Sequence, residues 1–114
     1  MPHFILDCSD TILEDYSEEH ILAQIHAVAH ATGLFDEDDI KVRLQPFKTY
    51  FVGNKKQDFI HVFAYIMEGR STEQKADLSK RVVQKLALLF PKIPRIAMNV
   101  YDFEKATYCN REML

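Results

Sequence analysis

The stretch that decides the fold is Met1-Pro2-His3-Phe4-Ile5-Leu6-Asp7-Cys8. Its apolar centre predicts a strand over residues 2–8 with at least one buried face. A proline at the first position of a strand is ordinary, because it has no N–H to give to a sheet ladder. Methionine before proline is also usually removed after synthesis, and removal would leave Pro2 with a free secondary amine that can act as a base. This stretch is compatible with both interpretations.

The composition is that of one soluble globular domain. The chain has 114 residues, of which 47% are hydrophobic and 27% charged, so disorder is not expected. The net charge is −3 and no basic stripe alternates with aromatic residues, which argues against nucleic-acid binding. No segment has the length or the pattern of a membrane span or a signal peptide. Cys8 and Cys109 are therefore expected as free thiols in the cytoplasm.

Helix and strand signals alternate along the rest of the chain. Ser17 is a good N-cap and Gly33 a good helix end, and Ser71 with Gln74 forms a capping box. Residues 36–39 are expected to be a solvated acidic turn. The expected elements are a helix over 18–32, a strand over 40–45 that Pro46 interrupts, a strand over 59–67 covered on both faces, a helix from 72 that Pro91 stops, and a strand over 96–103.

This order is β-α-β followed by β-α-β, which predicts an α+β fold. Two parallel β-α-β units side by side give a four-stranded sheet with two helices on one face. We expect a single domain over 1–114 with pseudo-repeats at about 1–52 and 57–104. The sheet face without helices should then pack against other copies in an oligomer.

Three stretches resemble the 5-carboxymethyl-2-hydroxymuconate isomerase family of the tautomerase superfamily. They are Pro2-His3-Phe4-Ile5-Leu6-Asp7-Cys8-Ser9-Asp10, Ala31-Thr32-Gly33-Leu34-Phe35 and Gly69-Arg70-Ser71. The last strand, Met98-Asn99-Val100-Tyr101-Asp102-Phe103, looks closer to the macrophage migration inhibitory factor branch of that superfamily. The resemblance implies a tautomerase-like homotrimer with inward-facing sheets. It also implies a cofactor-free isomerase of aromatic-compound catabolism, which moves a double bond in a 2-hydroxymuconate-type dicarboxylate by proton transfer.

The resemblance also implies the site residues. Pro2 would be the general base, and cationic side chains would bind the substrate's carboxylates and the dienolate charge. Arg70 and Arg43 match arginines of the family, while Lys41 stands where the family has another arginine and lacks its bidentate fork. Without the resemblance, Arg70 is equally well a solvated loop residue, and Lys41 and Arg43 fit a solvated strand face.

Other reactive side chains fit structural roles better. His26 and His30 are four residues apart, but no H-E-x-x-H pattern or third ligand accompanies them, so no metal site is expected. Cys8 is expected to be a small core residue and His3 a packing residue. Four aromatic residues either line an apolar pocket or belong to the core: Tyr50, Phe51, Tyr101 and Phe103.

Two alternative functions remain from the sequence. The first is a keto–enol tautomerase of the phenylpyruvate type. The second is a non-catalytic trimer with the same fold that binds a small molecule or a protein, and the departure at Lys41 motivates it. A ferredoxin-like regulatory domain is disfavoured by the absence of linkers. Catalysis by Pro2 requires that Met1 be removed, because an acylated nitrogen is not a base.

Overall fold

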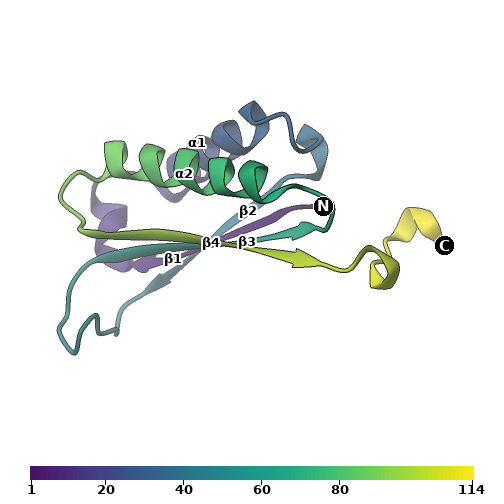
Figure 1. The fold of residues 1–114 in the computed structure, drawn as a ribbon. Helices are drawn as coiled ribbons and strands as arrows, with labels where there is room; N and C mark the ends of the chain where they lie inside the picture. Colours follow the sequence, from purple (N-terminus) through teal and green to yellow (C-terminus); the bar gives the residue numbers. More distant parts are fainter.

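The computed structural model describes residues 1–114 as a four-stranded mixed sheet with two helices on one side (Figure 1). The strand order is β2-β1-β3-β4; β1 is parallel to β2, β3 is parallel to β4, and β1 and β3 are antiparallel. The expected fold class is thereby confirmed. The elements are β1 (His3–Ser9), α1 (Glu18–Ala31), β2 (Lys41–Phe47), β3 (Phe59–Met67), α2 (Thr72–Leu89), β4 (Arg95–Phe103) and the short 3-10 helices η1 (Asp10–Glu14), η2 (Glu37–Asp39), η3 (Lys105–Thr107) and η4 (Arg111–Met113).

The core lies between the helices and the sheet. Every second residue of β1 is fully buried on the helix side, namely Phe4, Leu6 and Cys8. Each helix contributes buried residues spaced about one turn apart, which is the pattern of an amphipathic helix. These residues are Ile21, Ile25 and Ala29 of α1 and Leu78, Val82 and Leu86 of α2. Pro2 is also buried, and strand alternation puts it on the same face as Phe4.

Local signals set the helix ends that border the N-terminus. Gly33 follows α1 with φ +73°, a conformation that glycine adopts without steric cost. At the start of α2, the Ser71 hydroxyl accepts from the Gln74 N–H at 3.1 Å, and Gln74 Oε1 accepts from the Ser71 N–H at 2.9 Å. The expected capping box is confirmed. The C-terminal end of α1 and the N-terminal end of α2 lie near the end of the sheet at which β1 begins (Figure 1).

Pro46 does not interrupt its strand, contrary to the sequence expectation. β2 continues through Pro46 to Phe47 and pairs with β1 on one side only. The Lys41 N–H donates to the Pro2 carbonyl on β1 at 3.1 Å. Backbone N–H groups alternate in direction along a strand, so the nitrogen of Pro46 points away from β1. An edge strand therefore loses no ladder bond at this proline.

The expectation that both faces of β3 are covered is wrong for the single chain. The helices bury only alternate residues of β3, and the opposite face of the sheet carries no helix (Figure 1). Tyr65 of β3 is 39% exposed there and stacks on Tyr101 of β4, which is 44% exposed, with ring centroids 5.3 Å apart. We call this side of the sheet, which no helix covers, the open face. The C-terminal residues continue past the end of β4 and extend away from the body of the molecule (Figure 1).

The two cysteines differ sharply in accessibility. Cys8 is fully buried, and burial raises the pKa of its thiol to about 12, whereas Cys109 is exposed. Because the thiolate is the reactive form, iodoacetamide at mildly alkaline pH should alkylate Cys109 and spare Cys8 in the native protein. Peptide mass mapping measures this, with denatured protein as the control in which both react. Equal labelling of the two thiols under native conditions would contradict the packing of β1.

Candidate active site

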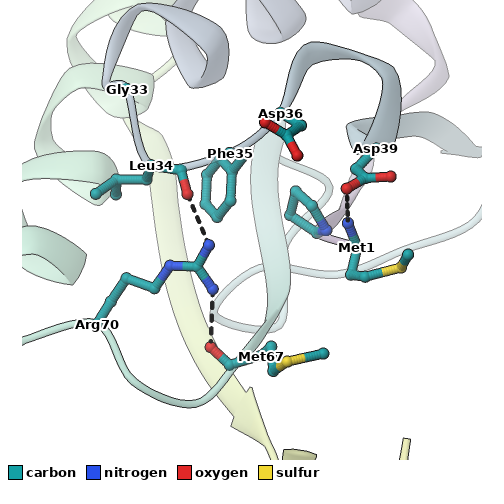
Figure 2. Close-up of a pocket in the computed structure, with 9 residues that line it drawn as sticks. Met1, Gly33, Leu34, Phe35, Asp36, Asp39, Met67 and Arg70 are labelled. Atoms are coloured by element: carbon teal, nitrogen blue, oxygen red, sulfur yellow. Dashed lines mark hydrogen bonds and ion pairs between the residues drawn. The ribbon is translucent and has the colours of Figure 1, made fainter. Parts of the chain in front are cut away.

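A pocket of about 250 Å³ opens at the start of β1 (Figure 2). Four segments meet there: the chain start, the loop from α1 to β2, the end of β3 and the turn before α2. Neither α1 nor α2 combines the length and the hydrophobicity that a membrane-spanning helix needs. The residues that line the pocket are Met1, Pro2, Gly33, Leu34, Phe35, Asp36, Asp39, Met67 and Arg70.

Pro2 is held in this pocket by its neighbours in the sheet. Its ring is buried, and its carbonyl accepts the N–H of Lys41, the first residue of β2. The fixed φ of proline adds a further restriction on the position of the nitrogen. With Met1 attached, the only free amine of the pocket belongs to Met1, and its nitrogen lies 3.6 Å from Asp39 Oδ2.

Arg70 reaches the same pocket from the turn before α2. Its Nη2 donates to the Leu34 carbonyl at 2.6 Å, and its Nη1 donates to the Met67 carbonyl at 3.2 Å (Figure 2). The guanidinium also lies over the ring of Phe35 at 5.0 Å, and that ring packs edge-on against Phe4 of the core. A guanidinium carries five N–H donors. The hydrogen bonds thus hold the group in position while other donors stay available for an anion.

Arg43 and Lys41 do not line this pocket. They pair in register with Ile5 and His3 of β1, so their side chains lie on the open face of the sheet. Arg43 Nη1 donates to His3 Nδ1 at 3.1 Å, and Lys41 Nζ donates to the Asp39 carbonyl at 3.0 Å. Within one chain, the structure brings Arg70 together with Pro2 and places the other two cations on the opposite side of the sheet.

The surroundings of the chain start favour the uncharged forms of the Met1 amine and the His3 imidazole. Burial is the largest effect that lowers the pKa of the Met1 amine, and Lys41 and Arg70 lower this pKa further, while Asp39 raises it. Burial also lowers the pKa of His3, with additional contributions from Arg43, Lys41 and the terminal amine. His3 is therefore neutral at neutral pH, and its Nδ1 is free to accept from Arg43.

Residues 36–39 form the exposed acidic turn that the sequence suggested, because Asp36, Glu37 and Asp38 are exposed and Asp39 is half-buried, but the turn also makes contacts that the sequence did not indicate. Asp36 and Asp39 line the pocket, and Glu37 Oε2 is 3.1 Å from His26 Nε2 and 4.0 Å from His30 Nε2 of α1. The hydrogen bond from His26 is the main reason that the pKa of Glu37 lies below its usual range. No cluster of three or more His, Cys, Asp or Glu side chains could hold a metal ion.

The aromatic candidates lie elsewhere. Phe51 is 73% exposed in the connection between β2 and β3, next to the isolated bridge between Val52 and Lys55, and Tyr101 lies on the open face. Tyr50 donates its hydroxyl to Asp58, and Phe103 stacks on Tyr108. None of these four residues lines the pocket, where the aromatic wall is Phe35.

The comparisons with known proteins agree with the fold. The family model of 5-carboxymethyl-2-hydroxymuconate isomerase matches residues 2–106. The 5-carboxymethyl-2-hydroxymuconate Delta-isomerase of Escherichia coli is 26% identical over an alignment of 106 residues that covers 91% of this chain and 84% of the relative.

Solved structures show the same fold at low identity. A 5-carboxymethyl-2-hydroxymuconate isomerase from Deinococcus radiodurans superposes with a TM-score of 0.82 at 20% identity, over 96% of this chain and 88% of its own. A fused 4-OT symmetric trimer superposes with a TM-score of 0.83 at 14% identity, over 96% and 94%. Because the family model spans nearly the whole sequence, this chain belongs to the 5-carboxymethyl-2-hydroxymuconate isomerase family.

Proposed function

We propose that this protein moves a double bond in a 2-hydroxymuconate-type dicarboxylate, with the amine of Pro2 as the general base. Membership of the family makes the chain an isomerase with a 5-carboxymethyl-2-hydroxymuconate isomerase-like function. The observation that supports the base most directly is the pocket itself, because it encloses the chain start and carries Arg70 on its opposite wall.

The proposed reaction is a proton transfer with no net change in composition. After Met1 has been removed, the lone pair of Pro2 takes a proton from a carbon next to the substrate's carbonyl. The electron pair of the broken C–H bond spreads over the conjugated chain as a dienolate. The protonated amine then returns its proton at the other end of the chain, which shifts the double bond and restores the free base.

Two properties of the pocket suit this chemistry. A prolyl amine must be largely unprotonated to act at neutral pH, and burial together with Lys41 and Arg70 lowers the pKa of an amine at the chain start. Arg70 has donors available beyond the two that bind carbonyls, and these can stabilise a carboxylate or the dienolate oxygen. Arg70 is thus proposed as the substrate-binding residue of this pocket.

Lys41 and Arg43 enter the proposal through other copies of the chain. Both side chains lie on the open face, whose stacked tyrosines remain exposed in a single copy. We propose a homotrimer that buries these faces inward; the name of the fused 4-OT structure describes that protein as a symmetric trimer. In such an assembly, Lys41 and Arg43 would supply a second cationic group to a neighbour's pocket, where a dicarboxylate needs one.

A second candidate function is keto–enol tautomerisation of a phenylpyruvate-type monocarboxylate. It is favoured by the charges in the pocket, where Arg70 is the one cationic side chain and Asp36 and Asp39 are both acidic. A substrate with one carboxylate can pair with Arg70, whereas the second carboxylate of a dicarboxylate would meet the acidic side chains.

Assays with two substrates separate these functions. Purified protein that lacks Met1 is incubated with a 2-hydroxymuconate-type dienol and, separately, with enol-phenylpyruvate, and ketonisation is followed by ultraviolet absorbance. We expect the dicarboxylate to have the higher kcat/KM. A preference for enol-phenylpyruvate would favour the second candidate, and no ketonisation of either substrate would favour a non-catalytic binding protein.

A further inference from the structure

Asp39 lies beside the terminal amine at the mouth of the pocket. Its Oδ2 is 3.6 Å from the Met1 nitrogen, and Figure 2 shows the carboxylate and this nitrogen pointing toward one another. The side chains of Asp39 and Met1 are 40% and 27% exposed, so solvent screens the pair only in part. The sequence pattern had indicated no contact of this residue with the chain start.

This proximity does not depend on Met1. The Lys41 N–H donates to the Pro2 carbonyl, and the parallel register of β1 and β2 puts Pro2 across from Ile40, the residue after Asp39. The backbone nitrogens of Met1 and Pro2 belong to consecutive residues, so they are less than about 4 Å apart. Asp39 Oδ2 therefore lies within about 8 Å of the Pro2 nitrogen, which is inside one Debye length at physiological salt, so its charge acts on the amine of Pro2 after Met1 is removed.

Charged and titratable groups surround the amine from every element that packs against it. Asp39 is the group that stabilises the ammonium form, whereas burial, Lys41 and Arg70 act against it. The complete set is His3 of β1, Asp36 and Asp39 at η2, Lys41 of β2, Arg70 before α2, and Tyr108 of the C-terminal segment, whose hydroxyl contacts the Met1 sulfur.

We propose that Asp39 is a positioning residue for the amine that transfers the proton: its carboxylate pairs with the protonated amine and holds the nitrogen at the mouth of the pocket. This inference rests on the proposed function of Pro2. The amine is cationic between the two proton transfers, and it must keep its position until the proton is returned. The same pairing favours the protonated amine at rest, so it leaves less free base at low pH.

The charge-neutral substitution Asp39→Asn tests the proposal. The free amine is the active form, so kcat/KM rises with pH through the pKa of the amine. Loss of a neighbouring carboxylate lowers that pKa, and the acid limb of the kcat/KM profile should move to lower pH by about half to one unit, given the partial solvent exposure. A ¹⁵N NMR titration of protein labelled at proline measures the same pKa without any turnover.

Asp38→Asn is the matched control. Asp38 belongs to the same 3-10 turn, is exposed, and its side chain makes no hydrogen bond or ion pair. This variant removes the same charge and should leave the amine pKa within about 0.2 unit of the wild type, since exposed charges at longer range are screened. Asp39→Glu should restore most of the wild-type profile.

The two measurements distinguish failure of this inference from failure of the proposed function. Equal shifts in Asp39→Asn and Asp38→Asn, or no shift in either, would overturn the role of Asp39 even if the enzyme is active. A pKa that falls only in Asp39→Asn, in a protein that turns over neither substrate, would uphold the ion pair and overturn the proposed function of the amine. A shift in both the titration and the rate profile supports both.

Discussion

A variant that keeps Pro2 in amide linkage is expected to lose about 10²- to 10⁴-fold in kcat/KM, which is the usual contribution of a general base. An N-terminal extension that prevents removal of Met1 makes this variant. An amide nitrogen has no basic lone pair, so the proposed proton acceptor would be absent. Misfolding would not explain the loss, because the fold already accommodates Met1 in the pocket.

Two further proteins make this prediction specific. The same extension placed after Leu114, which is 95% exposed, should leave kcat/KM unchanged. Pro2→Ala should give a loss at the lower end of this range, about 10²-fold, because alanine keeps an amine but loses the fixed φ of the ring. Full activity of the N-terminally extended protein would exclude Pro2 as the base.

Arg70→Ala is expected to lower kcat/KM by about 10²- to 10³-fold, the range seen when one donor to a developing oxyanion is removed. It should also lower the free energy of unfolding by about 1–3 kcal/mol, because the side chain donates to the Leu34 and Met67 carbonyls. Chemical denaturation and steady-state kinetics measure the two effects separately.

Arg81→Ala is the control for loss of an arginine. Arg81 lies on α2 in an exposed ion pair with Asp77, away from the pocket lining, so its removal should change neither kcat/KM nor stability appreciably. Arg70→Lys should recover part of the rate but little of the loop anchoring, because an ammonium lacks the fork that reaches two carbonyls. A rate for Arg70→Ala equal to that of Arg81→Ala would remove Arg70 from the proposed site.

Local sequence signals predicted the helix ends well. The capping box of Ser71 and Gln74 and the helix end at Gly33, with φ +73°, form within a few residues of sequence. Such local features can be predicted from the residue types alone. The apolar run Phe4-Ile5-Leu6 likewise predicted a strand with at least one buried face, and Phe4, Leu6 and Cys8 form that face. Pro2 precedes β1 and Arg70 follows β3. Because β1 and β3 are antiparallel neighbours in the sheet, the start of β1 lies beside the end of β3, and the two residues line one pocket.

Features that depend on the neighbours of a strand could not be predicted in the same way. Pro46 was expected to interrupt its strand, because the local sequence does not show that β2 pairs on one side only. The alternation of Lys41 and Arg43 showed that they share a face but not that this face lies opposite the pocket. The sequence placed Asp39 in a solvated turn but did not indicate its contact with the chain start, because that contact joins residues far apart in sequence.

The central claim, that the free amine of Pro2 is the base, is tested most directly by intact-protein mass spectrometry of an active preparation, fractionated and assayed in parallel. We predict that activity follows the species lighter than the full sequence by one methionine residue. Full activity in a fraction whose mass retains Met1 would contradict this account.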